Sequence, residues 1–436
     1  MNLDEARAWL DDHINLARMV ADSRTVPPTL DRVRRLTELL GDPQDQYPVL
    51  HLTGTNGKTT TARMLSALLA AKGLSVGTLT SPYLERLNEE MAWNGEPISD
   101  GAFVELIEVL AAVEPVLGPD LRPNYFELVT AGAYRWFADI AVDAVVAEVG
   151  LGGRWDATNV ATAQVAVVTN VELDHVEYLG PTRQSIAAEK AGIIKPGSHL
   201  VLGETDRELR AIFDASGPAT VWQAHGDFGC DANELAHGGR LLTLRTPGAT
   251  YEDVYLPLHG AHQGLNAACA LAAAQAFFGE PLNEDVVQEA FASVTSPGRM
   301  EVLSRRPLTV IDGAHNPAGA RAAAATLAEE FSAVEGRVLV VGMMRQRDPV
   351  EMLRALDAQQ AKLVVATEPD SPRALPAADV AAAATSLGVE ATAITSVSAA
   401  LERALAVADP DDLVFVTGSL YVVGEARTRL RDSAHG

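Results

Sequence analysis

The stretch "HLTGTNGKTTTARMLSALLAAKG", residues 51–73, joins a glycine-rich turn to an apolar helical pattern through a lysine and paired threonines. Residues 47–54, "YPVLHLTG", predict a buried strand, and residues 59–73 predict an Ala/Leu-rich helix that closes at Gly73. Gly54 and Gly57 allow backbone N–H groups to face a phosphate, and the helix that starts near Lys58 directs its positive end toward them. The stretch therefore predicts a phosphate-binding loop between a strand and a helix.

The loop differs from the common pattern G-x-x-x-x-G-K-[ST], because Leu52 stands five residues before Gly57. Lys58 still supplies a mobile positive charge for the outer phosphates, and Thr59 or Thr60 supplies a hydroxyl for Mg²⁺. The alternative is an ordinary strand-to-helix turn that carries a surface lysine. The flanking strand, the lysine and the paired threonines favour the phosphate-binding loop.

The chain has 436 residues, more than one hydrophobic core usually supports, so we expect two domains. Its 34 basic and 58 acidic residues give a net charge of −24, which argues against nucleic acid as the main partner. Cys230 and Cys269 lie far apart, so we expect no disulfide framework, no zinc site and a reducing cytoplasm. The acidic N-terminus and the lack of a run of about 18 apolar residues predict a soluble protein without a secretory signal or membrane span.

Further continuous apolar runs, at residues 74–82, 142–150 and 163–175, are typical of strands buried on both faces of a parallel sheet. Helical patterns at residues 99–117, 126–140 and 182–194 separate these runs. The alternation predicts an α/β domain whose first strand is followed by the phosphate-binding loop.

The pattern restarts after Pro297 and Gly298. Four more strand candidates, "LTVIDGAHN", "RVLVVGMM", "AKLVVATEPD" and "DLVFVTGSL", are separated there by Ala-rich helical stretches. We therefore predict a larger parallel-sheet domain at residues 1–297 and a smaller Rossmann-like α/β domain at residues 298–436.

After "GTNGKTT" the chain carries, in order, "TSPYLERLNEE", "YFELVT", "EVGLGGRWDATN", "LDHVEYLG", "EKAGII", "PGRM" and "IDGAHNP". This set, from about residue 29 to about residue 420, resembles the folylpolyglutamate synthase/dihydrofolate synthase family. "GTNGKTT" alone is shared with the Mur peptide ligases. The resemblance implies a Mur ligase-like fold with a P-loop domain that binds ATP and a pterin or folate. It also implies an ATP-dependent carboxylate–amine ligase, in which the amine of L-glutamate attacks an acyl phosphate. We expect small-molecule substrates and a monomer.

Metal ligands for phosphoryl transfer are expected beside the phosphate-binding loop. Glu148 ends one predicted strand and His175 follows another, so both would lie at the carboxyl edge of a parallel sheet. The resemblance implies that Ser81, Glu148 and His175 bind Mg²⁺. Two magnesium ions are expected. His175 taken alone is more typical of an ordinary loop histidine.

Lys190 in "EKAGII" occupies a position that is typically carbamylated in the family it resembles. CO₂ would convert the amine into an anion that can ligate or orient a metal. This requires a lowered amine pKa, which burial would provide, although a lysine on a helix is usually solvated. Lys58, Lys190 and His315 are the catalytic candidates.

The segment "EVGLGGRWDATN" is not a dinucleotide fingerprint, because Trp155 stands where the last glycine of G-x-G-x-x-G is required. By resemblance, two segments contact the pterin-bearing substrate: Asn124, Tyr125, Phe126 and Glu127, and Arg154, Trp155, Asp156 and Ala157. An aromatic ring can stack on a pterin, and a carboxylate can accept its N–H groups. The alternative for Phe126 is a core position at the start of a helix.

The resemblance assigns ATP binding to Gly54, Asn56, Gly57, Lys58, Thr59, Thr60, Asn266, Arg299 and Asp312. Arginine suits phosphate oxygens, and a carboxylate at a strand end suits ribose hydroxyls. His315 and Asn316 are expected on the same face. Because Arg299 and Asp312 lie in the boundary and the second domain, we expect domain closure to complete the site and exclude water.

Two departures from the family bear on substrate choice. Glu90 stands where many relatives have arginine, which reverses a charge close to the substrate side, and residues 27–29, "PPT", replace an Asp-Leu-Gly-like segment of bifunctional relatives. They leave open whether dihydropteroate, a folate or both are accepted.

Two other functions remain as alternatives. A Mur-type ligase for a UDP-sugar peptide would need a uridine-binding domain, for which the roughly 46 residues before the first strand are too few. An ATP-binding switch without ligation would not require Glu148, His175, Lys190 and Asp312 together.

Overall fold

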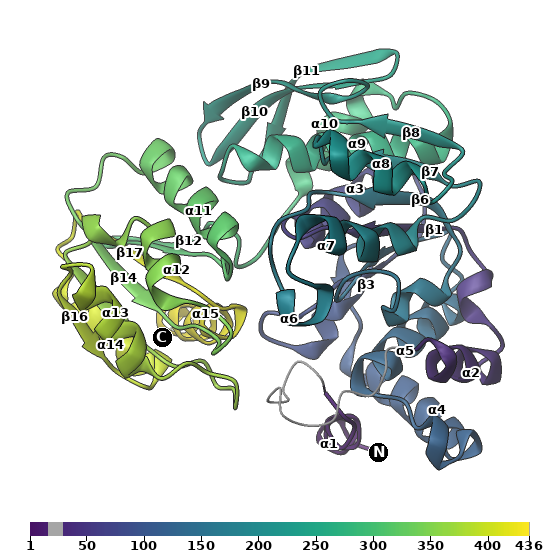
Figure 1. Ribbon diagram of the computed structural model, residues 1–436, viewed down its shortest axis with the longest axis horizontal. Helices are drawn as coiled ribbons and strands as arrows, with labels where there is room; N and C mark the ends of the chain where they lie inside the picture. Colours follow the sequence, from purple (N-terminus) through teal and green to yellow (C-terminus); the bar gives the residue numbers. More distant parts are fainter. Residues whose placement is uncertain (16–28, 436) are drawn as a thin grey trace.

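The computed structural model describes residues 1–15 and 29–435, so Pro27 and Pro28 lie outside the described residues. The described strands form three sheets. Figure 1 shows the C-terminal sheet and its helices as a lobe that is separate from the other two sheets. This arrangement confirms the two-domain α/β organisation that the sequence predicted.

An 8-stranded sheet forms the centre of the larger lobe. Its strands are β1 (Val49–Thr53), β2 (Val76–Leu79), β3 (Met91–Trp93), β4 (Glu96–Pro97), β5 (Ala144–Glu148), β6 (Ala163–Val168), β7 (His199–Leu202) and β8 (Thr220–Gln223). Their order is β4-β3-β2-β5-β1-β6-β7-β8, parallel except where β3 pairs with β2 and β4. Because β6 ends at Val168, residues 169–175 form a loop rather than the longer strand predicted from the sequence.

Helices cover both faces of this sheet, because side chains on both faces of its strands are apolar. On one face Leu50 and Leu52 of β1 pack with α3 (Lys58–Ala71), α9 (His262–Phe278) and α10 (Glu284–Ser293). On the other face Val49 and Val145 pack with α1 (Leu3–Asp11), α2 (Asp31–Leu39), α4 (Asp100–Leu117) and α5 (Tyr125–Asp139). β1 is buried along its whole length, which fixes the position of the loop that follows it.

The chain after β6 adds α6 (Val176–Leu179), α7 (Arg183–Lys190) and α8 (Arg207–Asp214). A 3-stranded antiparallel sheet follows, formed by β9 (Gly229–Ala236), β10 (Gly239–Thr246) and β11 (Ala249–Leu256). The sequence reasoning did not predict this sheet. Its apolar residues Leu242, Leu244 and Val254 join the core formed by α3 and α9.

A 6-stranded sheet forms the C-terminal lobe, in the order β12-β13-β17-β14-β15-β16. Its strands are β12 (Glu301–Arg305), β13 (Leu308–Ile311), β14 (Arg337–Val341), β15 (Leu363–Ala366), β16 (Ala391–Ala393) and β17 (Leu413–Thr417). Its helices are α11 (Pro317–Glu330), α12 (Pro349–Ala355), α13 (Ala377–Ser386), α14 (Val397–Val407) and α15 (Leu420–His435). The four strands predicted from the sequence are β13, β14, β15 and β17.

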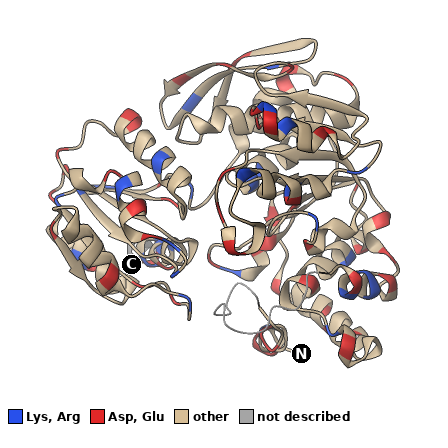
Figure 2. Cartoon of the chain, in the orientation of Figure 1, with Lys and Arg blue, Asp and Glu red and all other residues tan. Residues whose placement is uncertain are grey.

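Figure 2 shows acidic and basic residues interspersed over both lobes. None of the helices formed by residues 1–15 and 29–435 has the length and apolar character needed to cross a membrane. Because the overall net charge is −24, an anionic ligand can be attracted only where basic groups form a local positive cluster, such as in a pocket.

Candidate active site

The glycines of the phosphate-binding loop are required by their neighbours. Gly57 has a left-handed backbone at φ +82°, and a Cβ there would lie 2.4 Å from Asn266 Oδ1. A Cβ on Gly54 would lie 1.8 Å from Thr169 Oγ1. The loop backbone therefore lies directly against the end of β6 and the start of α9, immediately before the N-terminus of α3.

Hydrogen bonds hold the loop in this shape. The Thr169 hydroxyl donates to the Asn56 carbonyl at 2.7 Å. Lys58 Nζ donates to the carbonyls of Gly54 and Thr55 at 3.1 and 3.2 Å. The ammonium group therefore lies over the loop, where it can meet the outer phosphates of a nucleotide.

Glu148, at the end of β5, lies buried beside this loop. Its Oε1 accepts a hydrogen bond from Thr59 Oγ1 at 2.9 Å, and its Oε2 accepts one from the Ser81 N–H at 3.3 Å. Burial raises the pKa of Glu148, while Lys58 and these hydrogen bonds oppose the rise. Ser81 Oγ is buried and has no hydrogen-bond partner among the described residues.

Thr60 lies apart from this group. Its hydroxyl is 3.0 Å from Ser296 Oγ, and the residue is 3% exposed. Of the two threonines that the sequence offered as sources of a metal-binding hydroxyl, Thr59 is therefore the one in contact with Glu148.

The residues around Glu148 fit Mg²⁺. The described part of the chain has no group of three or more His, Cys, Asp or Glu side chains able to hold a metal ion. Mg²⁺ does not need such a group, because it is usually bound by one or two carboxylates and completes its ligands with water and substrate phosphates. The buried Ser81 hydroxyl that lacks a partner beside the Glu148 carboxylate is the observation that supports the fit.

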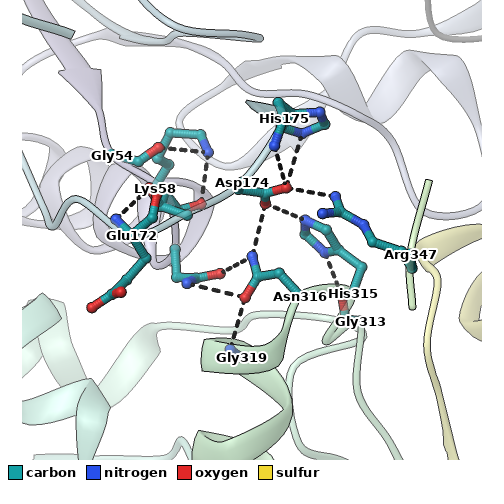
Figure 3. A network of polar contacts seen from close by, with 12 residues as sticks. Gly54, Lys58, Glu172, Asp174, His175, Gly313, His315, Asn316, Gly319 and Arg347 are labelled. Atoms are coloured by element: carbon teal, nitrogen blue, oxygen red, sulfur yellow. Dashed lines mark hydrogen bonds and ion pairs between the residues drawn. The ribbon is translucent and has the colours of Figure 1, made fainter. Parts of the chain in front are cut away.

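Asp174, in the loop after β6, connects the larger lobe to the C-terminal lobe (Figure 3). Its Oδ2 accepts a hydrogen bond from Asn316 Nδ2 at 2.8 Å, and its Oδ1 lies 2.6 Å from Arg347 Nη2. His315 Nε2 lies 3.6 Å from Oδ2. Asn316 also donates to Asn56 Oδ1 of the phosphate-binding loop at 3.0 Å. The C-terminal lobe therefore contacts both Asp174 and the loop through one asparagine.

His175 follows Asp174 with a left-handed backbone at φ +49°. The backbone N–H of His175 donates to Asp174 Oδ1 at 2.8 Å. Burial lowers the pKa of His175 to about 4, although Asp174 opposes the shift. The imidazole is therefore neutral near pH 7, the form in which histidine ligates a metal. Burial raises the pKa of Asp174, but His315, His175 and Arg347 outweigh this effect and hold it well below its usual range.

Lys190, at the end of α7, is 3% exposed, and its Nζ donates to the Gly54 carbonyl at 2.8 Å. No carboxylate of the described residues forms an ion pair with it. Burial, with a contribution from Lys58, lowers the pKa of Lys190 to about 7. A substantial fraction of neutral amine is therefore present near pH 7, as carbamylation requires.

The predicted catalytic residues meet at one pocket of about 350 Å³. Lys58, Lys190 and His315 line it together with Asp174 and the turn at residues 149–152. The sequence reasoning placed these side chains in different segments, and the fold brings them together.

Phe126 and Asp156, which were predicted to contact the pterin, lie against Gly150 of the same turn. A Cβ on Gly150 would lie 2.7 Å from Phe126 Cζ and 3.3 Å from Asp156 Oδ2, so the ring and the carboxylate converge there. Asp156 Oδ2 accepts from the Leu151 N–H at 2.9 Å, and Oδ1 accepts from the Thr158 N–H at 3.0 Å. Burial raises the pKa of Asp156, which these bonds oppose. The Asp156 carboxylate therefore stabilises the turn through hydrogen bonds to its backbone.

The segment at the start of α5 is held by its own hydrogen bonds. Asn124 Oδ1 accepts from the Glu127 N–H at 2.9 Å and caps the helix. The buried Glu127 carboxylate pairs with Arg32, with Oε1 2.9 Å from Nη2. Glu127 is thus engaged within the protein, and Tyr125 is buried beside it.

The remaining predicted substrate residues differ in exposure. Ala157 is buried, whereas Trp155 is 47% exposed. The half-exposed Arg154 side chain donates from Nη2 to the Ala188 carbonyl at 3.2 Å. Trp155 and Arg154 therefore lie at the surface of the turn rather than within it.

The predicted ATP residues lie at the junction of the lobes. Asn266 contacts Gly57, as described above. Asp312, directly after β13, accepts from the N–H groups of Met300 and Ala314 at 2.9 and 2.8 Å. Its carboxylate therefore organises the backbone around Arg299.

Glu90 is 3% exposed and does not face solvent. Its Oε1 accepts from the Tyr83 N–H at 3.2 Å, and its Oε2 has no hydrogen-bond partner among the described residues. Burial raises the pKa of Glu90 to about 8. The charge reversal expected near the substrate is therefore largely a buried, neutral carboxyl group at pH 7.

Asp174, Arg347 and Arg32 are parts of this site that the sequence reasoning missed. Asp174 stands directly before His175, after a predicted strand, so the argument that singled out His175 could have included it. Arg347 and Arg32 reach Asp174 and Glu127 from distant segments, and no local pattern marks either arginine.

Comparison with known proteins identifies the family. The family models "Mur ligase middle domain" and "Mur ligase, glutamate ligase domain" match residues 131–274 and 298–420. The dihydrofolate synthase/folylpolyglutamate synthase of Mycobacterium tuberculosis is 39% identical over 92% of this chain and 90% of its own length. The protein of that name from Escherichia coli is 34% identical over 95% and 93%.

Solved structures agree with these matches. The structure of Mycobacterium tuberculosis folylpolyglutamate synthase complexed with ADP has a TM-score of 0.91 at 39% identity and covers 98% of each chain. Escherichia coli FolC in complex with DHPP and ADP has a TM-score of 0.86 at 30% identity and covers 100% of this chain and 99% of its own. The chain therefore belongs to the folylpolyglutamate synthase/dihydrofolate synthase family of Mur-type ligases.

Proposed function

We propose that this ADP-forming amino-acid ligase joins L-glutamate both to dihydropteroate and to reduced folates, through an acyl phosphate. One observation carries the proposal: a single pocket is lined by the phosphate-binding loop, Lys190 and the turn that leads to Phe126 and Asp156. Such a pocket brings the phosphate of ATP within reach of a carboxylate on a substrate with an aromatic ring system.

In the first step the substrate carboxylate attacks the outer phosphorus of ATP, which forms the acyl phosphate and releases ADP. Lys58 and the N-terminal amides of α3 hold the phosphates and neutralise their charge. Ser81 and Glu148, with Thr59 beside them, would hold Mg²⁺, and His175 is the further ligand that we propose. When bound, Mg²⁺ supplies further neutralisation of phosphate charge.

In the second step the glutamate amine attacks the acyl carbon, which forms the amide and releases phosphate. The glutamate ammonium must first lose a proton. His315 can accept it at Nε2, because its Nδ1 lies 2.9 Å from the Gly313 carbonyl, to which it donates, and Asp174 Oδ2, 3.6 Å from Nε2, can stabilise the added proton. The contacts of Asn316 and Arg347 with Asp174 support a closed arrangement that keeps water from the acyl phosphate.

Two finer assignments belong to the same proposal. Residues 1–297 form the domain for ATP and the pterin or folate, and residues 298–436 form the domain that closes over it. Lys190 carries a carbamate in the active enzyme, which is supported by its lowered pKa, its burial and its place in the pocket. The carbamate would replace a buried cation with an anion beside Lys58.

Steady-state assays with each acceptor test the function. ADP release should require an acceptor and L-glutamate together, and both dihydropteroate and a reduced folate monoglutamate should be turned over. Turnover of the folate without any turnover of dihydropteroate would restrict the enzyme to tail lengthening. Turnover of neither acceptor would contradict the proposal.

A further inference from the structure

A second pocket lies between the lobes. It has a volume of about 390 Å³, and residues of both lobes line it: Thr59, Arg63, Thr80, Pro82, Tyr83, Leu84, Glu89, Ser296, Pro297, Arg299 and Leu420. Thr59 is shared with the group around Glu148, so the pocket adjoins the region where the nucleotide phosphates are expected. Its basic residues are Arg63 and Arg299.

Arg63 reaches this pocket from the phosphate-binding helix itself. It lies one turn after Thr59 on α3, and residues four apart share one face of a helix. Burial lowers the pKa of Arg63, and Arg299 is one of the positive charges that add to this effect, while Glu89 and Glu148 oppose it. The two guanidinium groups are therefore close enough to repel each other.

Arg299 reaches the pocket from the boundary between the lobes. A Cβ on Gly313 would lie 2.2 Å from Arg299 Nη1, so the glycine leaves the space that the guanidinium occupies. The same arginine contributes a positive field at Glu148. Arg299 thus lies between the second lobe and the end of β5.

Neither guanidinium has a direct ionic or hydrogen-bond partner in the part of the chain that the structure describes. Among residues 1–15 and 29–435, no carboxylate forms an ion pair and no acceptor forms a hydrogen bond with the side chain of Arg63 or Arg299. Arg427 nearby shows the contrast, because it pairs with both Glu301 and Glu85. Partly buried guanidinium groups without partners are costly, and an anion between them would offset that cost.

We propose that Arg63 and Arg299 form a phosphate-binding clamp across the lobe junction, with Arg63 as a nucleotide-binding residue of this enzyme. The clamp rests on the proposed function, which places ATP beside Glu148. Guanidinium groups bind phosphate oxygens through parallel N–H donors, and the neighbouring Thr80 hydroxyl can add to them. One arginine comes from each side of the junction, so a phosphate in the clamp favours the closed arrangement.

Nucleotide binding by the full-length enzyme tests the clamp. Isothermal titration with Mg²⁺ and the analogue AMPPCP, ADP or AMP compares the wild type with Arg63→Gln and Arg63→Lys. Loss of a charged hydrogen-bond donor should weaken AMPPCP binding about 10- to 100-fold in Arg63→Gln, with a smaller loss in Arg63→Lys. AMP binding should change by less than about threefold. Arg135→Gln is the matched control, because Arg135 pairs with Asp139 on the surface of α5.

Thermal unfolding separates the clamp from a structural role. Without nucleotide, Arg63→Gln should unfold at the same temperature as the wild type or higher, because it removes a repelled, partly buried charge. The rise in Tm produced by AMPPCP should shrink in this variant. A lower Tm without nucleotide, with an unchanged AMPPCP-induced rise, would show a structural role and overturn the proposal.

Two further results would decide the source of the phosphate and the validity of the clamp. If inorganic phosphate binds the wild-type ADP complex more tightly than the Arg63→Gln complex, the clamp holds the transferred phosphate; if ADP affinity falls instead, it holds a phosphate of ADP. AMPPCP and ADP affinities within twofold of the wild type in Arg63→Gln would overturn it. These titrations need no turnover, so a failure of glutamate ligation in the wild type would remove the proposed function without deciding the clamp.

Discussion

Asp174 of the larger lobe and Arg347 of the C-terminal lobe form an ion pair with an Oδ1–Nη2 distance of 2.6 Å, and their side chains are 6% and 17% exposed. Asn316 bonds the other oxygen of the same carboxylate and also contacts Asn56 of the phosphate-binding loop. The lobe junction is therefore connected directly to the loop that is expected to hold ATP (Figure 3). Breaking the junction at Asp174 should change catalysis as well as stability.

Asp174→Ala should destabilise the protein by about 3–5 kcal/mol, because it leaves the Arg347 charge with little solvent and no ion-pair partner among the described residues. The value of kcat should fall at least tenfold, since Asn316 loses one of its contacts at the loop. Unfolding and steady-state kinetics measure the two effects. Asp214→Ala is the control, because its pair with Arg210 is exposed and should contribute less than about 1 kcal/mol. Equal effects of the two variants would contradict the importance of the junction.

Glu148→Gln and His175→Ala should abolish ligation while the fold is retained. Each variant removes a ligand that the proposed Mg²⁺ site needs, and neither leaves a large cavity. Circular dichroism should match the wild type, and ADP release with both substrates present should fall by orders of magnitude. Near-normal turnover in both variants would remove these residues from the proposed site.

The fold could be predicted from the sequence where burial leaves a strong pattern. β1 and α3 were predicted within a few residues because apolar runs and the glycine-rich turn mark them. β9 to β11 were missed, since their partly exposed strands mix polar and apolar residues.

The candidate site was predictable only in part, for a physical reason. Strand-end residues such as Glu148 can be located from the strand that precedes them. The partners of Asp174 and Glu127, which are Arg347 and Arg32, depend on how distant segments pack. The burial of Glu90 likewise follows from tertiary packing, so a charge reversal in the sequence became a buried carboxyl group in the structure.

Activity should depend on CO₂ if Lys190 carries a carbamate. Because the pKa of Lys190 is lowered to about 7, its neutral, reactive amine becomes more abundant as the pH rises through that value. CO₂-free dialysis should therefore reduce kcat, and bicarbonate should restore it, more fully at pH 8 than at pH 6. Intact mass measured under native conditions should show the added CO₂. Full activity in an enzyme that carries no adduct would exclude the carbamate as the working group.

A second contact across the lobes joins the loop after β2 to α15. Glu85 accepts from Thr428 Oγ1 at 2.9 Å and also pairs with Arg427. A Cβ on Gly424 would lie 2.1 Å from the Leu84 carbonyl oxygen. Because this loop contains Ser81, whose N–H donates to Glu148, the contact can transmit the position of the C-terminal lobe to the Glu148 region.

Gly424→Ala should therefore weaken the lobe junction. The added methyl group would push against the Leu84 backbone, at a cost of about 1–3 kcal/mol, and the KM for ATP should rise. Denaturant unfolding and kinetics with varied ATP measure these effects. Gly101→Ala is the control, because a Cβ there would meet nothing within 4 Å, and in helix α4 the change should be neutral or stabilising. If Gly424→Ala has the same unfolding free energy and KM as Gly101→Ala, the close approach of Leu84 to Gly424 does not contribute to the stability of the lobe junction.

Glu90→Gln should change how stability depends on pH. Burial raises the pKa of Glu90 from 4.5 to about 8, so the folded protein holds this proton more tightly than the unfolded chain does. The stability that Glu90 contributes is therefore fully present below about pH 4.5 and is lost as the pH rises through about 8, at up to about 1.4 kcal/mol per pH unit. A glutamine keeps the shape without the ionisation. The Tm of Glu90→Gln relative to the wild type should accordingly rise between pH 5 and pH 8, whereas the exposed Glu96→Gln should show no such trend. Wild-type and Glu90→Gln curves that stay parallel over this range would mean that Glu90 is ionised in the folded protein and has found a partner for its charge.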